Sequence, residues 1–140
     1  MTDRELLELA AKAAGWTWWQ SKHGYWNIKG PDCEERAACC GWFKFDSYTG
    51  SNLAEPTPAD ALIEVGFDPL EDDGDAFRLA IKLNMTLIPN DGCNMAFAHC
   101  EMISRGERNL PVYQSHNGDQ CAALRRAIVR AAAEIGREMK

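Results

Sequence analysis

The stretch DQCAALRRAIVRAAAEIGREM, residues 119–139, is the clearest structural signal in the sequence. Asp119 has a side chain suited to cap a helix, and apolar residues then recur at helical spacing as far as Met139. The arginines of this stretch fall on a different face from the apolar residues. The predicted core stripe of the helix consists of Leu124, Ile128, Ala131, Ile135 and Met139.

Two more helices are predicted upstream. Thr2 and Glu5 have the spacing of a capping box, and Gly15 is a typical stop after the apolar positions that follow them. A second helix is expected over residues 68–83, because Asp68 followed by Pro69 is typical of a cap and a first-turn proline. Its wide apolar face is predicted to contain Ala76, Leu79, Ala80 and Leu83, with Phe77 and Ile81 beside them.

Strands are predicted in the regions between these helices. Residues 16–29 alternate on both sides of a turn, which is typical of a hairpin. Residues 85–115 contain three segments of strand character separated by short turns, which favours an antiparallel meander. Together the patterns predict one α+β domain, residues 1–140, in which three helices pack on an antiparallel sheet of about five strands in the order α-ββ-α-βββ-α.

Residues 30–60 are the least regular part of the sequence, and we interpret them as an insertion or a functional loop. Within them, Trp42 to Phe45 could form a short strand. Thr57 lies between two prolines and could cap a short helix over residues 59–63. Aromatic residues gather here and in the preceding hairpin, since nine of the 13 aromatic side chains lie between Trp16 and Tyr48.

The composition limits the classes of function. The 140 residues carry a formal net charge of −6, which argues against non-specific binding to nucleic acids or to anionic membranes. Hydrophobic residues make up 46% of the chain, enough for a core, but no apolar run is long enough to span a membrane. The N-terminus is charged and lacks an export signal, so we expect a cytoplasmic protein whose six cysteines are thiols.

Three segments resemble known proteins: MTDRELLELA at residues 1–10, DPLEDDGDAFRLAIKL at residues 68–83 and RRAIVRAAAEIGR at residues 125–137. They are similar to small proteins encoded by tailed phages and prophages of Gram-negative bacteria. That group is related in layout to the phage α-β-α sandwich domain and more remotely to the Nin-region X protein of lambdoid phages. The resemblance covers about a third of the chain, and residues 67–70 read Phe-Asp-Pro-Leu where the group usually has Trp-Asn-Pro-Leu. It implies a helical framework and a bacterial host cell, but no activity.

Two sets of residues could bind a metal ion. An acidic cluster at the start of the second predicted helix consists of Glu71, Asp72, Asp73 and Asp75. Because side chains one or two positions apart on a helix diverge, a capping and dipole role is favoured over a metal site. The zinc candidates are Cys33, Cys39, Cys40, Cys93, Cys100, His99 and His116, but none of them shows the spacing typical of zinc ligands. Cys100 and Cys121 are expected to be small buried side chains. No cofactor is therefore predicted, and the adjacent pair Cys39 and Cys40 is the one to test for thiol reactivity.

The sequence contains no motif of nucleophilic catalysis, of a phosphate loop or of dinucleotide binding. Ser115 followed by His116 places a hydroxyl beside a base, but His116 and His23 both fall in predicted turns, where we expect solvated side chains. No catalytic residue is predicted. A metal-dependent enzyme that acts through the acidic cluster is kept as an alternative.

The predicted binding residues are aromatic and basic. Loops commonly carry recognition, and Trp and Tyr are common at interfaces. Three residues of the hairpin, Trp16, Trp18 and Trp26, are instead expected to pack in the core. Arginines of the last helix are suited to bidentate contact with phosphate, although a solvated helix face would show the same pattern. The candidates are Trp42, Phe43, Phe45, Tyr48, Arg125, Arg126 and Arg130.

The leading hypothesis is a small phage-encoded, non-catalytic binding protein that engages a host macromolecule and so antagonises an antiviral defence. It rests on the resemblance, on the lack of catalytic motifs and on an acidic surface that bears aromatic residues. The alternative is a nucleotide binder or sponge that stacks a base on Trp42 or Tyr48 and holds phosphate with the arginines. A homodimer is compatible with the sequence.

Overall fold

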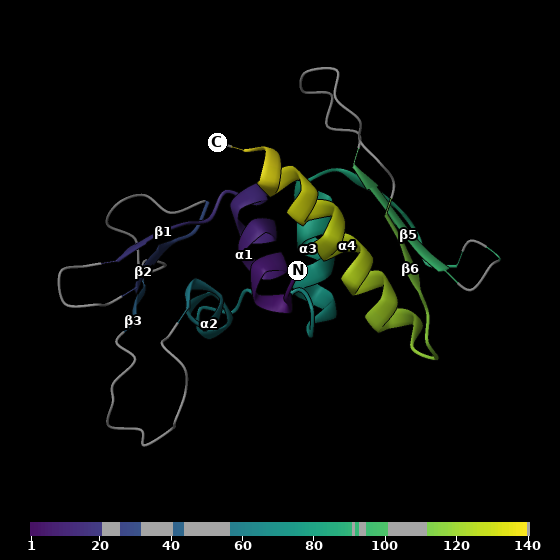
Figure 1. The fold of residues 1–140 in the computed structure, drawn as a ribbon, viewed down its shortest axis with the longest axis horizontal. Coiled ribbons are helices and arrows are strands. Elements are labelled where there is room, and N and C mark those ends of the chain that lie inside the picture. Colours follow the sequence, from purple (N-terminus) through teal and green to yellow (C-terminus); the bar gives the residue numbers. More distant parts are fainter. Residues whose placement is uncertain are drawn as a thin grey trace.

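The computed structural model describes residues 1–20, 26–31, 41–43, 57–90, 92, 95–100 and 112–139. The architecture is α+β, as predicted, with a central group of helices and a small sheet on either side of it (Figure 1). In chain order the described elements are α1 (Asp3–Ala13), β1 (Thr17–Gln20), β2 (Trp26–Lys29), β3 (Gly41–Phe43), α2 (Pro58–Glu64), α3 (Asp73–Lys82), β4 (Met85–Ile88), β5 (Met95–Cys100), β6 (Val112–Ser115) and α4 (Gln120–Glu138).

Helix α1 begins and ends where the local signals place it. The Thr2 hydroxyl accepts the N–H of Glu5 at 3.2 Å, and the Glu5 carboxylate accepts the N–H of Thr2 at 2.7 Å, so the predicted capping box is confirmed. The hydrogen bond from the Thr2 backbone lowers the pKa of Glu5. After the helix, Gly15 adopts φ of +92°, a left-handed conformation that glycine reaches without steric cost.

The irregular segment contains a helix and a strand. Helix α2 has Thr57 as its N-cap, and Asp60 completes a capping box, which confirms the short helix that Thr57 indicated. Leu62 of this helix is fully buried, so α2 belongs to the core and raises the number of described helices from the predicted three to four. Backbone of the expected strand is present as β3, while residues 32–40 and 44–56 lie outside the described residues.

Helix α3 begins later than predicted. Its N-cap is Asp72, whose carboxylate accepts the N–H of Asp75 at 2.7 Å, so the expected start at Asp68 was wrong. The carbonyl oxygen of Asp68 accepts the N–H groups of Glu71 and Asp72, which closes a turn before α3. Asp72 itself has an extended backbone, with φ of −108° and ψ of 121°, and this residue separates the turn from the helix. Phe77 and Ile81 are exposed, so the apolar face is narrower than expected. The buried residues of α3 are Ala76, Leu79 and Ala80.

The strands form two antiparallel sheets instead of one sheet of about five strands. Sheet A has the order β1-β2-β3 and sheet B the order β4-β5-β6. Every pairing joins strands that are neighbours in the sequence, and the helices lie between the two sheets (Figure 1). Because the helical layer separates them, the edges of the two sheets do not meet, and the single predicted sheet was wrong on this point.

The side chains on the inner face of sheet A pack against the helices. Trp18 of β1 lies opposite Ile28 of β2, and Ile28 is buried in the core. Trp16 and Trp18 are partly buried and pack against that core, as predicted. The side chain of Trp26 lies outside the described part of the structure. The ring centroid of Trp16 is 5.6 Å from that of Phe67, which connects the start of the sheet to the chain after α2.

Helix α4 packs between α1 and sheet B, so it is covered on two sides (Figure 1). The predicted stripe is therefore only partly correct: Ile128 and Ala131 are buried, whereas Met139 is 42% exposed. Small residues let the neighbouring elements approach closely on both sides. The buried residues of α4 are Ala123, Ala127, Ile128, Val129, Ala131, Ala132, Ala133 and Gly136.

His116 is buried and not solvated, contrary to the prediction. Its Nε2 lies 2.7 Å from the carbonyl oxygen of Pro89, which places a hydrogen bond between the end of β6 and the end of β4. A buried imidazole is retained when such a partner satisfies its polar atoms. His23 lies outside the described residues.

Candidate binding surfaces

Arg125 lies apart from the other two predicted arginines. Its Nε donates to the carbonyl oxygen of Leu70 at 2.8 Å, and its Nη1 donates to Oδ1 of Asp73 at 2.6 Å. The hydrogen bond with Asp73 raises the pKa of Arg125. Arg125 therefore joins α4 to the start of α3.

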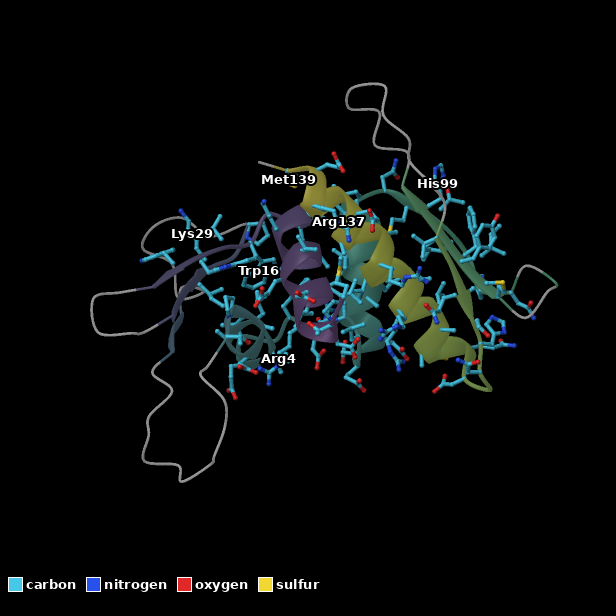
Figure 2. All side chains as sticks on the ribbon, in the orientation of Figure 1. Arg4, Trp16, Lys29, His99, Arg137 and Met139 are labelled. Atoms are coloured by element: carbon cyan, nitrogen blue, oxygen red, sulfur yellow. The ribbon has the colours of Figure 1, made fainter. Side chains whose placement is uncertain are left out.

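Arg126 and Arg130 lie together with a third arginine, Arg137, on one stripe of α4. Figure 2 labels Arg137 on this helix. The three positions are four and seven residues apart, so the side chains leave the same face of the helix. They line a cavity of about 370 Å³, which we call the arginine pocket. Its other polar side chains are those of Gln114 and Glu134, and Met1 and Leu6 contribute apolar contacts.

Two of these arginines are paired with carboxylates. Arg126 donates to Asp3 at 2.8 Å, and Arg137 donates to Glu134 at 3.2 Å. Arg137 has a second contact, from Nη2 to the thioether sulfur of Met1 at 3.8 Å. The pairs are exposed, so water screens their charges and each pair contributes little to stability.

Arg130 differs from its two neighbours. Its Nη1 donates to the carbonyl oxygen of Tyr113 at 3.0 Å and to Oε1 of Gln114 at 2.9 Å, both of which are neutral acceptors. In the part of the chain that the structure describes, no carboxylate lies within ion-pair distance of this guanidinium. The pocket thus contains a positive charge that is held in place but not neutralised.

The outer face of sheet B, the side away from α4, carries apolar side chains in register. Ile88 of β4 lies opposite Phe97 of β5, and Phe97 lies opposite Tyr113 of β6. The rings of Phe97 and Tyr113 meet edge to face with centroids 5.2 Å apart, and the ring of His99 lies 6.2 Å from that of Phe97. The described helices lie on the other side of the sheet (Figure 1). Ala96, which alternates with Phe97 and so points to that side, is fully buried. The outer face is therefore a candidate contact surface.

Sequence reasoning did not single out this row of side chains. The signal was present, because Phe97 alternates with the small residues Ala96 and Ala98, and Ile88 and Tyr113 occupy alternating positions in their own strands. Which side of each strand faces the helices depends on the register between strands and on the close packing of α4. Neither is visible in a single strand segment.

The predicted aromatic residues are not placed by the structure. Phe45 and Tyr48 lie outside the described residues. Trp42 and Phe43 contribute backbone to β3, but their side chains also lie outside the described part. These residues stay a predicted contact surface.

A second cavity, of about 600 Å³, lies between one side of α1 and Trp18. Glu8 on its wall accepts the N–H of Ala59 at 3.2 Å, at the start of α2. Lys12 donates to the carbonyl oxygen of Met139 at the end of α4. Because these charged groups connect helices to one another, we assign no reaction to this cavity.

Glu8 makes the stability of the fold depend on pH. Desolvation raises the pKa of Glu8 above 4.5, so the folded chain holds this proton more tightly than the unfolded chain. Stability is then lost as the pH rises through the raised pKa, and the ionised carboxylate is a cost at neutral pH. The substitution Glu8→Gln keeps an acceptor for the N–H of Ala59 without the buried charge.

We therefore expect Glu8→Gln to be more stable than the unchanged chain at neutral pH, by less than about 1 kcal/mol because the site is only partly buried. The difference should shrink as the pH falls below 4.5. Urea unfolding at neutral pH and at a pH below 4.5 measures this difference in stability. Equal stabilities at neutral pH, or the same difference at both pH values, would contradict the role given to Glu8.

Carboxylates of the acidic cluster make hydrogen bonds and ion pairs within the fold. Asp72 caps α3, and Asp73 pairs with Arg125. The Asp75 carboxylate accepts the N–H of Asp68 at 2.9 Å and pairs with Arg78. Across the described ranges, no three His, Cys, Asp or Glu side chains are grouped so that they could hold a metal ion.

Of the candidate zinc ligands, the structure describes the side chains of His99 and His116. Cys33, Cys39, Cys40 and Cys93 lie outside the described residues, as does the side chain of Cys100. His99 lies on the outer face of sheet B, and His116 is buried against Pro89. Cys121 on α4 is an exposed free thiol, so the expectation that it is a small buried side chain was wrong.

The comparisons with known proteins identify no relative. No protein-family model, no curated protein and no solved structure matches this chain. In the described parts of the chain, none of the helices has both the length and the apolar character needed to cross a membrane. Function is therefore argued from the surfaces described above.

Proposed function

We propose that this chain is a non-catalytic binding protein that engages a basic host protein through the outer face of sheet B. The observation that carries the proposal is the aligned row of Ile88, Phe97 and Tyr113, in which Ile88 is 41% and Tyr113 47% exposed. Apolar side chains that are contiguous across three strands offer a continuous contact area, and such exposed patches mark interaction sites. Tyrosine is common at interface hot spots.

The charge of the chain supports a basic partner. A net charge of −6 attracts positively charged surfaces, speeds their association and repels nucleic acid. The resemblance to small phage proteins supports a partner from the bacterial host, and occupying the surface of a defence protein would explain why no reactive site is needed.

A pull-down from a Gram-negative bacterial lysate tests this proposal. The double variant Ile88→Lys/Tyr113→Lys places positive charge in the middle of the outer face, where it opposes both the apolar contact and a basic partner. The matched control is Phe77→Lys/Ile81→Lys, because these residues of α3 are also apolar and are 60% and 61% exposed. We expect one host protein to be retained by the unchanged chain and by the control, and to be lost from the outer-face variant.

Three results would contradict the proposal. The first is that no host protein is retained above background. The second is that the outer-face variant retains the same protein as the control. The third is that the unchanged chain forms a homodimer through this face, measured by light scattering and abolished in the outer-face variant, since a second copy would then occupy the surface.

A further inference from the structure

We propose that the arginine pocket is a binding site for a small phosphate-bearing molecule, held by Arg126, Arg130 and Arg137. This site is separate from the proposed protein contact. Gln114 of β6 lines the pocket on the helix side of sheet B, whereas Tyr113 points from the same strand to the outer face. Each site can therefore be altered without the other.

The distribution of charge carries the inference. Three arginines occupy one stripe of α4 in a chain whose net charge is −6, and like charges four residues apart on a helix repel each other. Asp3 and Glu134 offset two of them. Arg130 has only neutral acceptors among the described residues, so the pocket retains positive charge that a bound anion would neutralise.

The geometry of the donors favours phosphate over a simple monovalent anion. A guanidinium is a planar fork of N–H groups that matches two oxygens of a phosphate at once. The bonds from Arg130 to Tyr113 and Gln114 use Nη1 and restrain the guanidinium. Among the described residues no hydrogen bond is made by its Nη2 or Nε, so these groups can donate to a ligand. The second contact of Arg137 is to a thioether sulfur, a weak acceptor that a phosphate oxygen would readily replace.

The size of the pocket limits the ligand. A cavity of about 370 Å³ lies at the small end of the range of about 300–1,000 Å³ typical of small-molecule sites. Met1 and Leu6 in its lining can contact an apolar or planar part of the ligand next to the phosphate. A phosphorylated metabolite or a mononucleotide fits these limits, and both present the same phosphate chemistry.

Calorimetric titration with inorganic phosphate, pyrophosphate and adenosine monophosphate at constant ionic strength tests the site, with sodium chloride as the reference salt. We expect the unchanged chain to bind at least one of the three, and Arg130→Gln and Arg137→Gln each to weaken that binding about tenfold or more. The matched control is Arg78→Gln, which removes an equally charged side chain of α3 that does not line the pocket. It should leave the affinity unchanged.

The outcomes separate the sources of phosphate. Tighter binding of adenosine monophosphate than of inorganic phosphate would support a nucleotide, and equal affinities would support recognition of the phosphate alone. Arg130 also bonds to β6, so its variant could fold less well, but Arg137 makes only exposed contacts and its variant tests the site independently. No binding of any of the three at millimolar concentration, or equal weakening by Arg78→Gln, overturns the proposal.

Discussion

Replacing Gly136 with alanine is expected to lower the free energy of unfolding by about 3 kcal/mol or more. A Cβ atom at this position of α4 would lie 1.9 Å from the carbonyl oxygen of Leu9 in α1 and 2.7 Å from its carbonyl carbon. These are backbone atoms, so no side-chain rotation can relieve the clash and the two helices must move apart. The expected sign is informative, because alanine in place of glycine at an exposed helical position stabilises a helix by about 1 kcal/mol.

Gly74→Ala is the matched control for this variant. Gly74 also lies in a helix, but a Cβ atom there would meet the ends of the Asp72 and Arg78 side chains at 3.1 Å and 3.2 Å, and these can shift. Chemical denaturation should therefore show a large loss of stability for Gly136→Ala and little or no loss for Gly74→Ala. If the two variants are equally stable, α1 and α4 do not pack as closely as described.

The variant Ile28→Ala is expected to cost about 3 kcal/mol, the second large effect. Ile28 is 1% exposed and is the side chain by which the middle strand of sheet A enters the helical core. Truncation removes several buried carbon atoms and leaves a cavity that the surrounding backbone cannot fill completely. We also expect sheet A to separate from the helices more readily, since the loss falls on a fully buried contact between them.

Trp19→Ala on the neighbouring strand is the control for Ile28→Ala. Trp19 is larger, but it is 50% exposed and lies on the outer side of sheet A, so its truncation should cost less than about 1 kcal/mol. Thermal and urea unfolding measure both variants, and hydrogen exchange of the β1 and β2 amides reports on the sheet itself. A larger loss for Trp19→Ala than for Ile28→Ala would mean that the two faces of sheet A are assigned the wrong way round.

Features that depend on residues close in the sequence were predicted well. The caps at Thr2, Thr57 and Asp119 were recognised because each side chain bonds to a backbone group about three residues away. The left-handed conformation of Gly15 was predictable for a similar reason, because it depends only on the helix end that lies next to it in the sequence. Where two local signals competed, the prediction was wrong: Asp68 and Asp72 are both suitable caps, and the choice between them depended on the turn that lies before α3.

The candidate binding residues were less predictable, because their positions depend on contacts with residues that are far away in the sequence. The spacing of Arg125, Arg126 and Arg130 does not reveal that Arg125 bonds to Leu70 and Asp73. Nor does it reveal that Arg126 pairs with Asp3 near the N-terminus and that Arg130 bonds to β6. The composition of the strands does not reveal that Phe97 faces outward. Both facts depend on contacts between segments that are far apart in the sequence.

The sequence alone therefore determined the α+β class, the approximate positions of the helices and strands, and the acidic charge of the surface, because these depend on local backbone bonding and on composition. The tertiary structure decided that the strands form two sheets, that small residues and not the largest apolar ones face α4, and that three arginines share one pocket. The physical reason is packing: α4 is covered by α1 on one side and by sheet B on the other. The close approach of these layers selects Ala96, Ala98 and Gly136 for the interior. It leaves Phe97 and Tyr113 on the outer face of sheet B and three arginines of α4 at the arginine pocket.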